Sequence, residues 1–388
     1  MASEPEKPKP QMPKLPAGET VAPPDDLLVV TSSPPARAHR SPVIAMRVVM
    51  IALLPAAIAS SYHFGARAAL LIVVAMASCV GAEFVWQKAL KKPVRVSDGS
   101  AALTGLLLAM TLGAQMSVYS IILGSVVAII VAKQFFGGLG MNIWNPALIG
   151  RAFLQVAFPE MTNGGFPMPS GQCEALVTNL SVPAAADAVT ASTPFAVDAV
   201  SSATPLMVAK NQELMAKVAD TASSWSASLG DFFIGAQPGS LGETSELALL
   251  IGGLFLVAVR LVDWRIPVGF ILTTFAAMTI LPHNVNSGAG FSENLTLSFA
   301  MTLSGGLFLG AFFMASDMVT SPITKNGRLL FAIGCGLITA LIRLYGGYPE
   351  VVCYAILIMN TTVPLIYRHI RPKVYGKQKP AQPVEAKA

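Results

Sequence analysis

The chain has 388 residues, of which 53% are hydrophobic and only 12% are charged, and its formal net charge is +5. A soluble domain carries roughly 25% charged residues, so this composition excludes an ordinary soluble enzyme and indicates a membrane protein in contact with lipid. The basic residues are spread among the ends of apolar segments, which argues against nucleic acid as a partner.

Both ends of the chain are polar. Residues 1–40 are rich in proline, and we predict a disordered cytoplasmic tail there. No cleavable signal peptide is recognisable before the first apolar segment, which we therefore expect to act as the insertion signal and to stay in the protein. Residues 371–388 are predicted to form a basic cytoplasmic tail.

Ten apolar segments approach the roughly 20 residues that a helix needs to cross a bilayer. They predict an all-α, polytopic integral membrane protein with about ten transmembrane helices. The segments form two blocks, residues 41–159 and 246–370, on either side of a polar loop at 160–245. About five spans per block is an odd number, which predicts two inverted repeats. The expected spans are 43–62, 66–87, 100–114, 118–135, 141–158, 246–262, 264–282, 296–316, 328–345 and 348–369.

The positions of lysine and arginine predict the orientation, because cytoplasmic connections carry the excess of basic residues. Every even-numbered connection is the more basic one, as Lys133 in the fourth, Arg265 in the sixth and Arg328 in the eighth illustrate. We therefore expect both termini on the cytoplasmic side of a bacterial or archaeal inner membrane. Residues 160–245 are expected outside.

The polar loop contains a candidate modification site. Residues 198–204, Asp-Ala-Val-Ser-Ser-Ala-Thr, resemble the signal at which bacterial enzymes attach flavin mononucleotide (FMN) through its phosphate to a threonine hydroxyl. Thr204 is the expected acceptor. The other polar residues of this signal are Asp198, Ser201 and Ser202.

The surroundings of Thr204 suit a phosphate but also have a simpler explanation. Pro205 and a plausible helix follow, and a helix N-terminus favours a phosphate group. The alternative is that Thr204 is a plain N-cap with proline at the first helical position. A second stretch that ends at Thr193 lacks the preceding alanine and a convincing helix, so Thr204 is the preferred acceptor.

Cysteine and histidine argue against a metal cofactor held by this chain alone. The four cysteines and four histidines are widely spread, with no Cys-x-x-Cys pair or other tight ligand spacing. Neither zinc, an iron–sulfur cluster nor haem is therefore expected here. One alternative stays open, namely that a single cysteine contributes to a cluster shared with a partner subunit. Any other redox chemistry in this chain would require an organic cofactor.

Several longer stretches carry a resemblance to known proteins. They are Ser97–Ser100 with Leu103–Gly105, Phe136–Ala147, Pro238–Ser245, Met314–Pro322 and Gly346–Glu350. These stretches resemble one family, which contains the D subunit of the Rnf electron transport complex and the B subunit of the sodium-pumping NADH:quinone reductase. The resemblance covers residues 28–370. The stretch Val-Val-Thr-Ser-Ser-Pro at 29–34 and the modest length look more like the Rnf member.

This resemblance implies covalent FMN on Thr204, attached by a dedicated flavin transferase, and a non-covalent riboflavin within the membrane. A second redox centre also follows from distance, since one outer-face flavin is too far from the inner side of a hydrocarbon core about 30 Å thick. Amide side chains suit a flavin edge, and glycines let backbone approach a flat ligand. The alternative is a broken-helix turn whose polar groups satisfy each other. The candidates are Asn142, Asn145, Gly138 and Gly140.

Polar residues within or beside the apolar spans are candidates for an ion path, because such residues are costly in a membrane. Asp317 is the first choice for contact with a coupling cation, and Glu83 and Thr104 are further candidates. Two simpler explanations stay open. Glu83 could pair with Arg151, and Asp317 could cap the turn that follows it.

The predicted function is that of a membrane component in a redox-driven ion pump. By resemblance the pump is a ferredoxin:NAD oxidoreductase that moves Na⁺ or H⁺, in which this chain carries electrons between sister subunits. The chain has no Gly-x-Gly-x-x-Gly fingerprint for NAD, holds no catalytic residue of its own and is not expected to turn over alone. The alternatives are the corresponding component of the quinone reductase and a cofactor-free channel or transporter with inverted repeats.

Overall fold

The structure is a computed structural model that describes residues 41–159, 166–167, 201–202, 233, 239–243, 245–281, 291–346 and 351–370. By internal contacts the chain divides into Met1–Ser41 and Pro42–Ala388, and the description below concerns the second unit. Apart from one short strand pair, the described regular structure is helical.

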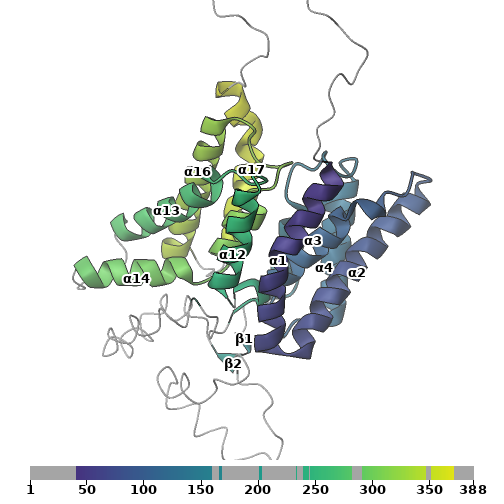
Figure 1. The fold of residues 1–388 in the computed structure, drawn as a ribbon, viewed down its shortest axis with the longest axis horizontal. Coiled ribbons are helices and arrows are strands. Elements are labelled where there is room, and N and C mark those ends of the chain that lie inside the picture. Colours follow the sequence, from purple (N-terminus) through teal and green to yellow (C-terminus); the bar gives the residue numbers. More distant parts are fainter. Residues whose placement is uncertain are drawn as a thin grey trace, which may run out of the picture. The chain divides into compact units, whose positions relative to one another are not determined.

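The first block, coloured purple to blue in Figure 1, contains five main helices. A 3₁₀ turn, η1 (Val96–Asp98), precedes α3, and a π-helical turn, η2 (Ile130–Gln134), continues α4. Its main helices are α1 (Pro42–Phe64), α2 (Ala66–Ala89), α3 (Ser100–Met110), α4 (Val118–Ile129) and α5 (Pro146–Ala157).

The second block begins with the 3₁₀ turn η4 (Leu241–Glu243) and contains a second π-helical turn, η6 (Gly310–Met314). Strands β1 (Phe166–Pro167) and β2 (Ser201–Ser202) both belong to the loop between the two blocks. They pair antiparallel, with Phe166 opposite Ser202. The helices of the second block are α12 (Glu246–Ala258), α13 (Arg265–Ile280), α14 (Phe291–Leu303), α15 (Leu307–Leu309), α16 (Lys325–Tyr345) and α17 (Val352–His369).

Helix occupies a large part of all ten apolar segments, which confirms the all-α, multi-pass class of the protein. Among the described residues, three helices, α1, α2 and α16, are long and apolar enough to cross a membrane by themselves. Five other apolar helices have only 10–17 residues, so the number of ten crossings stays a prediction.

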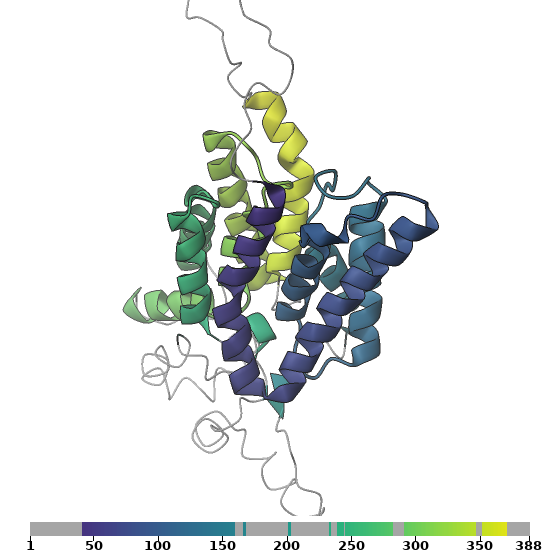
Figure 2. The ribbon, with the colours of Figure 1, turned by 45° about the vertical axis from the view of Figure 1, so that its right-hand side comes forward.

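The segment 296–316 is not one continuous span. Helix α14 ends at Leu303, and α15 and η6 follow after the turn Ser304–Gly306. Gly305 has a φ of +80°, in the left-handed region that favours glycine. In Figures 1 and 2, α14 lies across the direction of α12 and α17. The prediction of a single span is therefore wrong here, because the helix is interrupted after Leu303.

The packing of the first block is repeated in the second. Helix α2 packs against α3 and α4, as α13 packs against α14 and α16, and α4 contacts α5 as α16 contacts α17. The pairs α1–α12 and α5–α17 join the blocks, and Figure 2 shows α1 between the two groups. At the α1–α12 crossing, a Cβ on Gly252 would clash with the Ala52 carbonyl oxygen. The close approach of the two helix backbones therefore requires glycine at this position. The matching contacts support a duplicated architecture.

Two short helical pieces lie in the interior. Ten of the 11 residues of α3 are buried, as is every residue from Leu307 to Met314. At about 1.5 Å per residue, α3 is roughly 16 Å long, about half the thickness of a hydrocarbon core. These pieces are enclosed by the longer helices, and their ends line the cavities described next.

Candidate functional site

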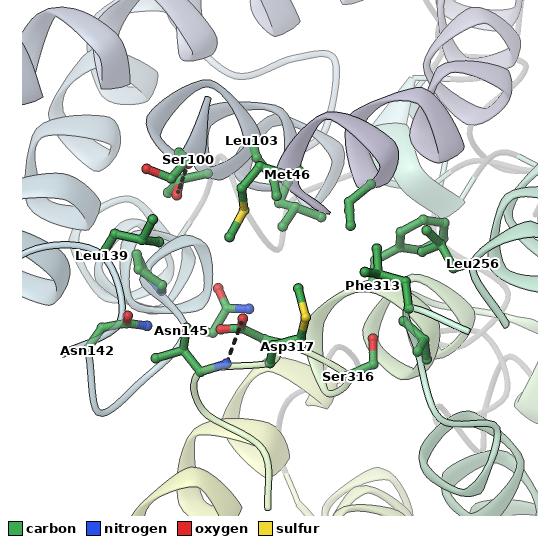
Figure 3. Close-up of a pocket in the computed structure, with 18 of the residues that line it drawn as sticks. Met46, Ser100, Leu103, Leu139, Asn142, Asn145, Leu256, Phe313, Ser316 and Asp317 are labelled. Carbon is green, nitrogen blue, oxygen red and sulfur yellow. Dashed lines mark hydrogen bonds between the residues drawn. The ribbon is translucent and has the colours of Figure 1, made fainter. Parts of the chain in front are cut away.

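A cavity lies between the start of α3 and the residues that follow η6 (Figure 3). Its empty volume is about 730 Å³, part of it open to solvent. Both blocks contribute to its wall, which is mainly apolar with a few polar groups. The residues that line it include Met46, Ser100, Leu103, Thr104, Lys133, Leu139, Asn142, Asn145, Leu256, Phe313, Ser316 and Asp317.

The two predicted asparagines both line this cavity (Figure 3). Asn145 is the N-cap of α5, because its Oδ1 accepts a hydrogen bond from the Ala147 amide at 3.0 Å and Pro146 takes the first helical position. Its Nδ2 donates to the Met314 carbonyl of the other block, at 3.4 Å. Asn145 therefore joins the two blocks as well as capping a helix.

Asn142 retains more hydrogen-bonding capacity than Asn145. Its Nδ2 donates to the Trp144 carbonyl at 3.0 Å, and Trp144 is fixed in turn by a hydrogen bond from its indole N–H to the Thr361 hydroxyl of α17. Among the described residues, no group donates to the Asn142 Oδ1. An amide acceptor is therefore available at the cavity wall.

The glycines before Asn142 shape the turn that positions it. Gly137, Gly138 and Gly140 have φ values of +116°, +100° and +89°, where a side chain would be strained. Leu139 between them lines the cavity, whereas Gly138 and Gly140 do not. A direct contact of these two glycines with a cofactor stays a prediction.

Asp317, which Figure 3 labels, and Thr104 line the same cavity from opposite blocks. The Asp317 carboxylate accepts hydrogen bonds from the Val319 amide and the Thr320 hydroxyl, each at 3.3 Å. Burial raises the pKa of the Asp317 carboxyl, and these two bonds lower it by less. Thr104 donates to the Ser100 carbonyl at 2.9 Å, which leaves its oxygen as an acceptor. Asp317 thus both caps the turn that follows it and lines the cavity.

Glu83 does not pair with Arg151. Its carboxylate forms a buried ion pair with Lys133 at 2.9 Å and also accepts hydrogen bonds from Gln134 at 2.7 Å and Gln87 at 3.2 Å. Glu83 and Lys133 are each about 2% exposed. The suggested Glu83–Arg151 pair is therefore wrong, because Lys133 of the η2 turn is the cation that pairs with this carboxylate.

Lys133 is the site residue that sequence analysis missed. Its place at the end of an apolar segment is typical of a connecting-loop charge, but its ammonium is buried, donates to the Ser100 hydroxyl at 2.6 Å and lines the cavity. Ser100 is held in turn by Asp98, whose Oδ1 accepts from the Ser100 amide and hydroxyl at 2.9 and 2.7 Å. The position of Lys133 in a π-helical turn is typical of functional regions. The sequence signal that could have identified Lys133 is the opposite charge of Glu83, which lies inside another apolar segment.

The chain is similar to known proteins over most of its length. A profile described as the NQR2, RnfD, RnfE family matches residues 29–376. The chain belongs to this family. A member from Acetobacterium woodii, named as the D subunit of a Na(+)-translocating ferredoxin:NAD(+) oxidoreductase complex, is 41% identical over 91% of the chain and 96% of its own length.

Two other members of the family carry related names. The D subunit of the proton-translocating ferredoxin:NAD(+) oxidoreductase complex of Clostridium ljungdahlii is 39% identical over 91% of the chain and 98% of its own length. The D subunit of the ion-translocating oxidoreductase complex of Stutzerimonas stutzeri is 39% identical over 87% and 93%. The predicted family resemblance is confirmed, and its members with these names are subunits of oxidoreductase complexes.

The structure describes little of the predicted flavin acceptor segment. Asp198 and Thr204 lie outside the described residues, and Ser201 and Ser202 are described only as strand β2. Within the described ranges, no group of three or more His, Cys, Asp and Glu side chains could hold a metal ion. The assignment of Thr204 stays a prediction from the loop sequence and the family.

Proposed function

We propose that this chain is the membrane-embedded D subunit of an ion-translocating ferredoxin:NAD oxidoreductase complex. In this proposal it carries covalent FMN on Thr204 and riboflavin in the cavity, and it couples electron transfer to the movement of Na⁺ or H⁺. The observation that carries the proposal is the cavity itself, which brings Asn142, Thr104 and Asp317 together from separate parts of the family motifs. The named relatives support the assembly and the reaction class.

The cavity fits a flat, mainly apolar ring with a polar edge. Its wall is mainly apolar, with a few polar groups, as is usual for small-molecule sites. The free Asn142 oxygen and the Thr104 oxygen could accept hydrogen bonds from a ring N–H, and the second Nδ2 proton of Asn145 could be donated to a ring carbonyl. Met46, Leu103 and Phe313 supply apolar contact.

The cavity also places a negative charge beside such a ring. Bound riboflavin would supply one- and two-electron transfer. The Asp317 carboxylate opposes the arrival of further negative charge and attracts a cation, since two unit charges about 4 Å apart interact by about 4 kcal/mol at an effective dielectric constant of 20. A cation held at Asp317 therefore favours electron arrival, and the arriving electron favours cation binding. This reciprocity is the physical basis that we propose for coupling.

The riboflavin site is tested by counting flavins in purified complexes that contain Asn142→Leu, with Met141→Leu as the control because Met141 is 68% exposed and does not line the cavity. The acid-released flavin per complex is expected to fall by one in Asn142→Leu and to be unchanged in the control. Covalent flavin should be the same in both. Full retention of non-covalent flavin in Asn142→Leu would place riboflavin elsewhere.

The covalent site is tested by the intact mass of the purified chain from a host that has the flavin transferase. We expect the mass of one attached FMN on the unaltered chain and on Thr193→Ala, and its loss in Thr204→Ala. An unmodified chain, or one that keeps the added mass in Thr204→Ala, would contradict the assignment. Neither measurement depends on turnover of the complex.

A further inference from the structure

The second block buries a carboxylate and a guanidinium that have unsatisfied hydrogen-bonding atoms. Glu246 is 1% exposed and Arg343 is 2% exposed. Among the described residues, no group donates to either Glu246 oxygen, and Nε and Nη2 of Arg343 have no acceptor. Arg343 uses only Nη1, which donates to the Met301 carbonyl. A buried polar group without a partner is costly, and a charged one is more so, which points to a ligand or a function for this arrangement.

Helix capping does not explain Glu246. It is the first residue of α12, but the cap is Ser245, whose hydroxyl accepts from the Ala248 amide at 3.3 Å. The other nearby carboxylate, Glu243, accepts from the Ser240 amide at 3.2 Å and belongs to the preceding turn. Glu246 is therefore the carboxylate of this cluster whose bonding capacity is unused.

Glu243 lines a second cavity, which has an empty volume of about 360 Å³. Thr111, Gly306, Met314 and Arg151 also line it, whereas Glu246 and Arg343 do not. Thr111 directly follows α3, and Gly306 precedes α15. Asp317, which lines the first cavity, follows η6.

Glu243 lies near the start of the broken helix formed by α15 and η6, and Asp317 follows its end. A Cβ on Gly306 would lie 3.2 Å from the Glu243 Oε1, so the two residues are in contact. The charge of Glu246, three residues after Glu243, interacts with those of Glu243 and Arg343. A path along α15 and η6 would therefore run from the Asp317 cavity to Glu243, within reach of the charge of Glu246.

We propose that Glu246 is a second cation-binding carboxylate, which takes up Na⁺ or a proton at the end of this path remote from Asp317. Its oxygens have no protein donors to displace, so the energetic cost of binding a monovalent cation there is low. Glu83, by contrast, has its charge neutralised by Lys133 and its oxygens occupied. The positive charge of Arg343, which interacts with that of Glu246, favours release of the cation. The role in transport rests on the proposed function, whereas binding at Glu246 does not.

Binding is tested with dicyclohexylcarbodiimide, which modifies protonated carboxyls in apolar surroundings, on the purified complex in detergent. Peptide mass spectrometry should find the adduct on Glu246 and not on Glu83. For a sodium site, NaCl protects Glu246 and KCl at equal ionic strength does not. For a proton site, labelling falls as the pH rises and does not respond to Na⁺. Labelling of Glu83 alone, or of neither residue at any pH, would overturn the inference.

Two variants connect binding with transport. Glu246→Gln keeps the size of the side chain and removes the charge, and Glu246→Asp keeps a carboxylate. We expect Glu246→Gln complexes to retain both flavins, lose the adduct and lose most ion transport in proteoliposomes, with Glu246→Asp intermediate. Wild-type transport by Glu246→Gln would end the proposal. If flavins were absent while Na⁺ still protected Glu246, the proposed function would fail and this site would stand.

Discussion

The two blocks of the protein each bury one acidic and one basic side chain, but they treat them differently. In the first block, Glu83 and Lys133 are in contact, and Gln87, Gln134 and Ser100 complete their hydrogen bonds. In the second block, Glu246 and Arg343 are equally buried, yet both have atoms without a partner among the described residues. Similar charges in a repeated architecture therefore support opposite roles.

The contrast separates structural charges from functional ones. A saturated pair such as Glu83–Lys133 has little capacity for a moving ion, because uptake would require breaking several bonds at once. Its position against Ser100 makes it a support for the cavity wall instead. Unsatisfied groups such as Glu246 are costly to fold, and ligand binding can offset that cost.

The largest expected effect is that of Lys133→Met. It leaves the Glu83 carboxylate buried without its counter-charge, a change that costs about 3–5 kcal/mol. We expect a large fall in the thermal unfolding midpoint of the purified complex and loss of non-covalent flavin, because Ser100 also loses its donor. Lys88→Met is the matched control, since Lys88 is exposed. The double variant Glu83→Leu/Lys133→Met should recover much of the stability. Equal midpoints for Lys133→Met and Lys88→Met would refute the supporting role.

A smaller effect on stability is expected from Glu246→Gln than from Glu83→Gln. Glu83→Gln removes a charge to which three side chains are bonded. Glu246→Gln removes a charge to which no described group donates a hydrogen bond. Unfolding midpoints of the two complexes, measured side by side without added Na⁺, should show a loss for Glu83→Gln and little change for Glu246→Gln. The reverse order would mean that Glu246 is the structural carboxylate.

The sequence predicts the helical class and the cavity residues well, for identifiable reasons. Hydropathy alone locates all ten helical segments, because lipid contact demands long apolar runs. Asn142, Asn145, Thr104 and Asp317 stand out as polar groups in glycine-rich or apolar stretches, and the structure brings all four to one cavity. That convergence could not be derived from spacing, since it depends on how the two blocks pack.

What sequence analysis missed depends on local turns and on tertiary pairing. The break after Leu303 depends on the left-handed Gly305, and glycine pairs of this kind also occur within continuous membrane helices. Lys133 resembles a loop charge because basic residues at span ends are usually topology signals. Only the fold shows that the η2 turn directs its ammonium inward to Glu83. Glu246 attracts no notice in the sequence because an acid at a helix start is ordinary.

The smallest expected effect concerns charges that stay near solvent. Asp263, in the connection between α12 and α13, accepts hydrogen bonds from the Arg265 amide at 3.1 Å and from the Arg328 guanidinium at 2.8 Å. Burial raises the pKa of the Asp263 carboxyl, but these bonds outweigh burial and hold the pKa below its ordinary value. The stabilisation is therefore present at neutral pH and is lost as the pH falls through the lowered pKa.

For such a partly exposed cluster we expect Asp263→Asn to cost about 0.5–1 kcal/mol at pH 7 and nothing in acid. Unfolding midpoints of the two proteins in one detergent should differ slightly at pH 7 and converge once the pH falls below the lowered pKa of Asp263. Added salt should reduce the difference at pH 7, unlike the loss in Lys133→Met, because salt screens exposed charges and not buried ones. A gap that persists in acid would show that Asp263 acts through something other than its charge.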